Sequence, residues 1–184
     1  HVDIELIESG STETEKLLLE GKVDITCMTT VPRYEELHYT LVENEELVLL
    51  TSRNTDLARR IPNGTPISIL EAKNENFISN KPGHSVRAIQ DSLFAAHNIS
   101  PKLLLETASI EIEKKVTIAC NAVMICPLNY IEKDENFRSQ AHIYPLQDID
   151  SKRHCYICHR KELYLTKYMR DFISILSEVE NPFL

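Results

Sequence analysis

The chain has 184 residues, 42% of them hydrophobic and 26% charged, an ordinary composition for a globular protein with a core. No apolar run approaches the roughly 18 residues that a membrane span needs. The acidic start HVDIELIESG lacks the basic region and apolar run of a signal peptide. The formal net charge is −8, with twelve acidic and three basic residues among the first 50. An acidic chain without a basic stripe argues against direct binding of nucleic acid by these residues.

The first part of the chain predicts two strands with a helix between them. Val2–Leu6 alternates apolar and acidic residues, which is typical of a strand with one face in water. A capping box at Thr12–Glu15 begins a short helix, and Val23–Met28 follows as the second strand. This β-α-β order predicts a parallel pair of strands joined by a crossover helix.

The rest of the chain continues to alternate strands and helices. The further predicted strands are Glu46–Thr51, Phe77–Ser79, Lys102–Glu106, Ala122–Cys126, His142–Leu146 and His154–His159. The further predicted helices are Asp56–Arg60, Ser85–His97, Ser109–Ala119 and Glu162–Leu176. Helical spacing places Ile112, Val116 and Ala119 on one buried face, and Leu165, Met169, Phe172, Ile173 and Leu176 on another. The alternation predicts an α/β protein with mostly parallel sheets.

The predicted strand His154–His159 contains a cysteine motif. Cys155, Cys158 and His159 form C-x-x-C-H, the spacing of c-type haem attachment. On a strand, residues three apart point to opposite faces, so the two thiols do not converge on one haem or metal ion. The five cysteines also lack the spacing of a disulfide framework, which favours reduced thiols and a cytoplasmic protein. We therefore expect no metal and no cofactor.

Several segments, taken in order, resemble the effector-binding domain of LysR-type transcriptional regulators. They are IELIESGSTETEKLLLEGKVDITCMTT, LVENEELVLLTSRNTDLA, FISNKPGHSVRAIQDSLFAAHNISPKLLLET, KKVTIACNAVMICP and IYPL. The resemblance implies two Rossmann-like lobes joined by two crossover strands, like the type 2 periplasmic binding proteins. Residues 1–52 and 146–184 would form lobe I, and residues 53–145 lobe II. The family's first strand and helix and its helix-turn-helix domain are expected to be absent from these residues.

In such a fold a ligand lies between the lobes, at the carboxyl ends of strands where helix N-termini present amide donors. Two stretches fit: the hydroxyl pair that ends the Val23–Met28 strand, and the polar loop of residues 79–85, which contains Lys81 and leads into a helix. Thr107 lies before another helix. Ser109 is better explained as a helix cap. The expected effector-contacting residues are Thr29, Thr30, Ser79, Asn80, Pro82, His84, Ser85 and Thr107.

The alternative for these residues is purely structural: Ser85 caps a helix and the threonines end a strand. By position, the resemblance implies effector contacts at Thr29, Pro82 and Ser85. Ser85 also stands where the peroxide-sensing branch of the family has its reactive cysteine, so thiol-based sensing at this position is unsupported.

The sequence thus predicts a sensor of a small effector, for which an anion or carboxylate fits. The sensor would act as a homodimer or homotetramer and reach DNA only through the missing helix-turn-helix. A solute-binding protein of a transport system, with the same fold, is the first alternative. An enzyme on this scaffold is the second, but the chain has no Gly-rich phosphate loop, no G-x-S-x-G and no H-E-x-x-H. No catalytic residue is therefore proposed.

Overall fold

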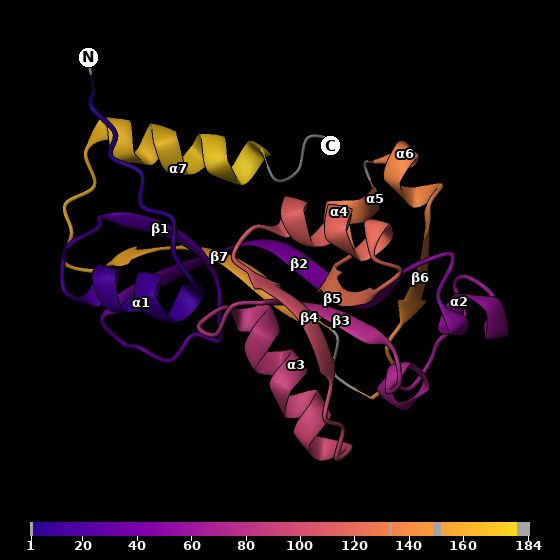
Figure 1. The fold of residues 1–184 in the computed structure, drawn as a ribbon. Helices are drawn as coiled ribbons and strands as arrows, with labels where there is room; N and C mark the ends of the chain where they lie inside the picture. The colour runs from indigo at the N-terminus through magenta and orange to yellow at the C-terminus, as the bar shows by residue number, and fades with distance from the viewer. Residues whose placement is uncertain (1, 133, 149–151, 180–184) are drawn as a thin grey trace. The chain divides into compact units, whose positions relative to one another are not determined.

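The computed structural model describes residues 2–132, 134–148 and 152–179 (Figure 1). It divides into two compact units, His1–Asn44 with Arg153–Leu184, and Glu45–Lys152. Parts of the expected lobe I, namely residues 1, 149–151 and 180–184, lie outside the described residues. Within the described residues, no helix has both the length and the apolar character needed to cross a membrane.

The second unit contains a mixed sheet. Its strands are the later part of β2 (Leu37–Ser52), β3 (Asn76–Asn80), β4 (Lys102–Thr107), β5 (Val123–Pro127) and β6 (Ala141–Pro145). β3 runs parallel to both β4 and β5, whereas β2 runs antiparallel to β5 and β6. The expectation of mostly parallel sheets is therefore wrong. A crossover helix makes consecutive strands parallel, as α3 does for β3 and β4, but β2 and β5 are distant in the chain and no such rule constrains them.

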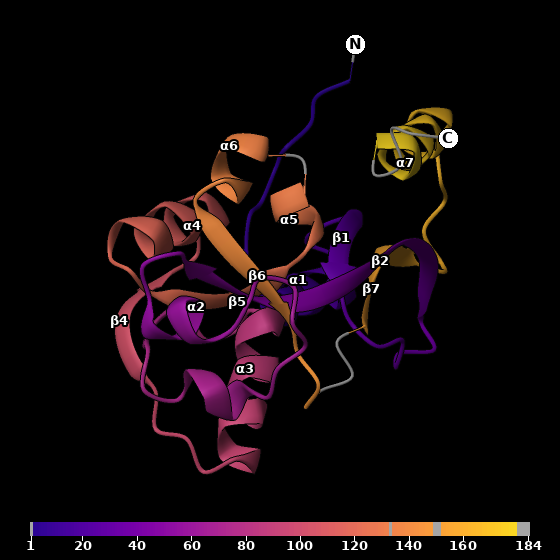
Figure 2. The same cartoon turned by 90° about the vertical axis from the view of Figure 1, so that its right-hand side faces the viewer.

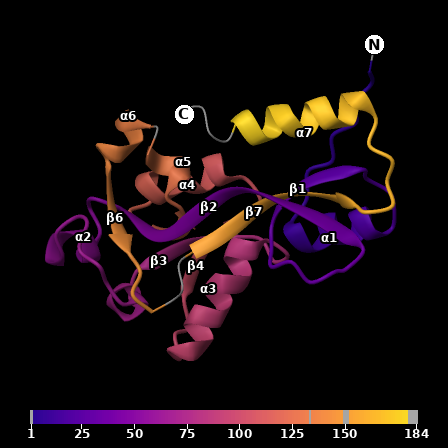
Figure 3. The same cartoon turned by 180° about the vertical axis from the view of Figure 1, so that it is seen from behind.

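Helices cover both faces of this sheet. They are α2 (Asp56–Arg60), the 3₁₀ turn η1 (Ile69–Ala72), α3 (Ser85–Ala96), α4 (Ile110–Ala119), α5 (Asn129–Glu132) and α6 (Glu135–Arg138). Figure 3 shows α3 on one side of the sheet and α4 on the other, and Figure 2 shows the same separation at right angles. Successive strand residues serve opposite cores: Phe77 packs with α3, its ring centroid 5.0 Å from that of Phe94, whereas Ile78 packs on the α4 side. The site described below is thus carried by a sheet supported on both faces.

The first unit is built on a smaller sheet. It contains α1 (Ser11–Leu19), β1 (Ile25–Thr29), the start of β2, β7 (Lys152–Arg160) and α7 (Lys167–Val179), with β7 between β1 and β2. Leu18 of α1 packs on Met28 and Cys158. The guanidinium of Arg160 donates to the carbonyl oxygens of Leu18 and Val23 at 2.7 and 2.8 Å, which fastens the end of α1 to the sheet.

Two expectations for this unit are wrong. Residues 2–10 form no strand, and Ile4 and Leu6 are 70% and 80% exposed. An alternating pattern gives a strand only where a neighbour accepts its backbone hydrogen bonds, and none of the described strands pairs with this segment. The expected apolar stripe of the last helix is only half-buried, and Phe172 is 36% exposed.

A substitution at Tyr144 tests how much one buried hydrogen bond stabilises the core of the second unit. Its side chain is fully buried, and its hydroxyl donates to the carbonyl oxygen of Ile61 at 2.8 Å. Tyr144→Phe leaves that carbonyl without its partner, so we expect urea unfolding to show a loss of about 1–3 kcal/mol. Tyr164→Phe, at a tyrosine that is 82% exposed, is the matched control and should change stability by less than about 0.5 kcal/mol. Equal effects of the two substitutions would contradict this role of the Tyr144 hydroxyl.

Candidate functional site

The carboxyl ends of β3 and β4 form one edge of the second unit. The two strands are parallel neighbours, and Asn80 is paired with Thr107 at their ends. Just beyond the pair, the amide of Lys81 donates to the carbonyl oxygen of Thr107 at 3.1 Å. The Thr107 hydroxyl in turn accepts from the amide of Ser109 at 3.2 Å. The loops that leave both strands are therefore tied together, and each leads into a helix.

The N-terminus of α3 is open at this edge. His84 is its N-cap residue but makes no capping bond with its side chain, and no acidic residue lies in the first turn. The structural alternative in which Ser85 caps α3 is therefore wrong: Ser85 is the first helical residue. Gly83 has φ +95°, and an added Cβ would meet no atom within 4 Å, so the space above the loop is free. First-turn amides beside the exposed Lys81 suit an anion.

The N-terminus of α4 is different, because its own sequence caps it. The hydroxyl of Ser109 accepts from the amide of Ile112 at 3.4 Å, which confirms the capping role predicted for Ser109. The two helices that meet this edge are thus not equivalent as ligand sites.

The face that α4 buries is partly polar, which the sequence did not predict, although Val116 packs against the core as expected. Ile112, expected in the buried stripe, is 48% exposed, and Ala119 is exposed too. Glu113 is 1% exposed, and Lys114 and Thr117 are also buried. From apolar periodicity, Ile112 is expected to be buried and Glu113 exposed. Only the contact with β3 reveals the true orientation, because the Asn80 side-chain amide Nδ2 donates to Glu113 Oε1. Burial raises the pKa of Glu113 to about 7, partly offset by that hydrogen bond.

A second buried polar atom lies on the other face of β3. Ser79 is 1% exposed, and its hydroxyl has no hydrogen-bond partner within the described residues. A buried hydroxyl without a partner costs free energy, so it marks a position for a bound water or ligand group.

The structure brings six of the eight expected residues to one edge of one unit. They are Ser79, Asn80, Pro82, His84, Ser85 and Thr107. The other two belong to the first unit. Thr29 ends β1, and the hydroxyl of Thr30 donates to the carbonyl oxygen of Val31 at 3.5 Å. An effector-binding role for all eight stays a prediction.

The C-x-x-C-H motif lies on β7, as the sequence predicts. Cys155 is paired with Thr29 and Cys158 with Thr26, and residues three apart on a strand face opposite ways. Cys158 points into the α1 core, where burial raises the pKa of its thiol to about 12. The two thiols therefore do not converge on one ligand.

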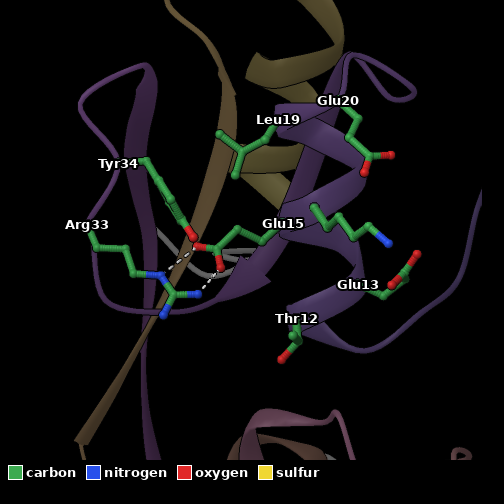
Figure 4. Close-up of a pocket in the computed structure, with 8 residues that line it drawn as sticks. Thr12, Glu13, Glu15, Leu19, Glu20, Arg33 and Tyr34 are labelled. Carbon is green, nitrogen blue, oxygen red and sulfur yellow. Dashed lines mark hydrogen bonds and ion pairs between the residues drawn. The ribbon is translucent and has the colours of Figure 1, made fainter.

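A pocket that the sequence analysis missed lies in the first unit, against α1 (Figure 4). It holds about 430 Å³ and is lined by Thr12, Glu13, Glu15, Lys16, Leu19, Glu20, Arg33 and Tyr34. The guanidinium of Arg33 forms an ion pair with the buried carboxylate of Glu15 and lies 5.2 Å from the ring centroid of Tyr34. Because its principal charges already satisfy one another, this pocket is a weaker candidate than the edge of β3 and β4.

Comparisons with known proteins bear on the identity of the chain. Residues 1–180 match the family model described as LysR substrate binding domain. A search of curated proteins found no match. The CcmR regulatory domain from Synechocystis PCC6803, solved with 2-PG, is similar at TM-score 0.76 and 20% identity, over 94% of this chain and 81% of that one.

Two further solved structures have the same fold. The effector binding domain of QuiR in complex with shikimate gives a TM-score of 0.73 at 18% identity, over 96% of this chain and 81% of that one. The BenM effector binding domain with its effector benzoate gives 0.66 at 18% identity, over 98% and 81%.

Glu113 makes the stability of the protein depend on pH. Its pKa is about 7 in the folded state against an ordinary 4.5, so the folded state binds more protons between these values. The free energy of unfolding therefore falls as the pH rises from about 4.5 to about 7. Glu113→Gln removes this loss. In urea unfolding, the free energy of unfolding of the wild type should fall by about 2–3 kcal/mol more between pH 5 and pH 8 than that of the variant.

The control is Lys115→Gln, which removes an exposed charge from the same helix. It should keep the pH dependence of the wild type. If the curves of Glu113→Gln and wild type run parallel from pH 5 to pH 8, the carboxyl of Glu113 does not titrate in this range.

Proposed function

Because the chain belongs to the family of LysR substrate-binding domains, we propose that it binds a small effector and relays this binding to a helix-turn-helix of the same regulator. The observation that carries the proposal is the joined edge of β3 and β4. There the uncapped N-terminus of α3, Lys81 and the space above Gly83 lie together. A small anion or carboxylate is the ligand class that this chemistry suits. Shikimate and benzoate, bound by two of the similar structures, are carboxylates.

The proposed contacts use the donors at this edge. The first amides of α3 and the Lys81 ammonium would hold the acidic group, and the hydroxyls of Ser85 and Thr107 would orient the rest of the molecule. Thr29 and Thr30 of the first unit are the proposed contacts from lobe I. Residues 1–52 with 146–184 and residues 53–145 remain the proposed lobes.

Signalling would proceed by population shift. An effector that binds one arrangement of the lobes more tightly favours that arrangement, by no more than the difference in its two affinities. The proposed assembly is a homodimer or homotetramer in the cytoplasm, where the regulator meets DNA. The family membership favours this proposal over a solute-binding protein of transport, and it supports the regulatory rather than catalytic role that we propose for the domain.

The test is a thermal-shift screen with benzoate, shikimate, sulfate, phosphate and the amino acids. A ligand at 100 times its Kd adds about 2.7 kcal/mol, which raises the Tm of a domain of this size by roughly 5–10 °C. We expect an acid to produce this shift. We expect Lys81→Met, Ser85→Ala and Thr107→Val each to reduce it.

Thr65→Val is the matched control for Thr107→Val. It lies in the loop between α2 and η1 and should leave the shift unchanged. A shift of equal size in the wild type and in all three site variants would contradict this location for the ligand. The absence of any shift across the panel would contradict the proposed ligand class.

A further inference from the structure

The contact between α4 and β3 departs from the usual pattern of a helix on a sheet. The helix turns Glu113 and Thr117, one turn apart, toward the sheet while Ile112 stays in water. The Thr117 hydroxyl is fully buried and has no hydrogen-bond partner within the described residues. Burying a carboxyl and an unsatisfied hydroxyl is costly, and such local conflicts are expected at functional positions.

Glu113 is connected to the proposed effector site through one side chain. The side-chain amide of Asn80 donates a hydrogen bond to Glu113. The backbone carbonyl oxygen of Asn80 accepts one from the Arg87 guanidinium of α3 at 2.9 Å. Asn80 is also paired in register with Thr107, and the backbone carbonyl oxygen of Thr107 accepts a hydrogen bond from the backbone amide of Lys81. Asn80 therefore contacts the carboxyl of Glu113 and also lies at the edge of β3 and β4.

The groups around Glu113 leave its charge unopposed. On α4, the Lys114 ammonium lies 3.1 Å from the carboxylate of Glu111 and 5.1 Å from the ring centroid of Phe137 on α6. From β5, the fully buried Cys126 thiol faces it, with its pKa raised by burial, so it is neutral.

The acidic residue of the neighbouring strand is also paired elsewhere. Glu106, on β4, is bound to Arg87. Within the described residues, no lysine or arginine forms an ion pair with Glu113.

A carboxyl in this setting has two distinct hydrogen-bonding states. Ionised, it only accepts, and it holds the Nδ2 group of Asn80 as the structure shows. Protonated, it gains an O–H donor, which can serve the Asn80 Oδ1 or the Thr117 hydroxyl. The Asn80 amide can then turn and present its other end at the edge.

We propose that Glu113 is a proton-dependent positioning residue, which sets the orientation of the Asn80 amide and thereby links effector binding to pH. The link to an effector rests on the proposed function, whereas the action on Asn80 does not. A negative effector at the edge favours the neutral form of Glu113, so binding takes up a proton and tightens as the pH falls. The domain would report acid and effector together.

The direct test is an NMR titration of the Asn80 side-chain amide from pH 5 to pH 9. In the wild type its resonances should shift with a midpoint near pH 7, and in Glu113→Gln they should stay constant. Lys115→Gln, at an exposed residue of the same helix, should titrate as the wild type does, which separates Glu113 from a general effect of helix charge. A wild type without this titration, or a titration that persists in Glu113→Gln, would overturn the proposal.

The second arm measures benzoate binding by calorimetry at pH 6 and pH 8, where benzoate itself stays ionised. Wild type and Lys115→Gln should bind benzoate roughly fivefold more tightly at pH 6 than at pH 8, the lower end of ordinary coupling between sites. Glu113→Gln should bind it equally at both pH values.

The two arms fail separately. Benzoate that does not bind at either pH counts against the proposed function for this ligand, while the Asn80 titration still decides the role of Glu113. Equal benzoate affinity at both pH values in the wild type overturns the link to effector binding.

Discussion

The parallel pairing of β3 with β4 is the constraint on which the proposed site depends. Parallel neighbours end at the same edge, so Asn80 and Thr107 meet there, and the bond from Lys81 to Thr107 continues the pairing into the loops. Each strand then enters a helix whose N-terminus faces that edge. Two segments that are distant in the sequence thus become one surface with backbone donors, a cation and hydroxyl groups.

The cores on the two faces of the sheet hold this edge in place, and they do so unequally. The α3 face is mainly apolar, with Phe77 edge-on against Phe94, and it also buries the Ser79 hydroxyl. The α4 face combines apolar contacts such as Ile78 with the buried carboxyl of Glu113. Burying that carboxyl lowers the stability of the folded state at neutral pH. The same carboxyl binds the side chain of Asn80 at the proposed ligand edge. A stability cost beside a proposed binding site is the pattern expected when function and packing compete.

Sequence reasoning succeeded where local chemistry decides the outcome. Alternating strands and helices, the Ser109 cap and the polar loop after Ser79 are all legible from short segments. Sequence reasoning failed where the structure of a segment depends on its contacts with distant parts of the chain. Val2–Leu6 has the pattern of a strand but no described neighbour, and antiparallel β2 could not be told from a parallel strand. Helix α4 turns Glu113 rather than Ile112 toward the sheet, where Glu113 accepts a hydrogen bond from Asn80, and the spacing of residues does not indicate this contact.

The central claim is that the ligand is held at the edge of β3 and β4, and amide hydrogen exchange tests it most directly. The domain is compared with and without a saturating amount of the compound that stabilises it most. The account predicts slower exchange at residues 81–87 and 107–110, because their amides are the proposed donors and the groups tied to them. Protection confined to residues 11–35, around the α1 pocket, would contradict it.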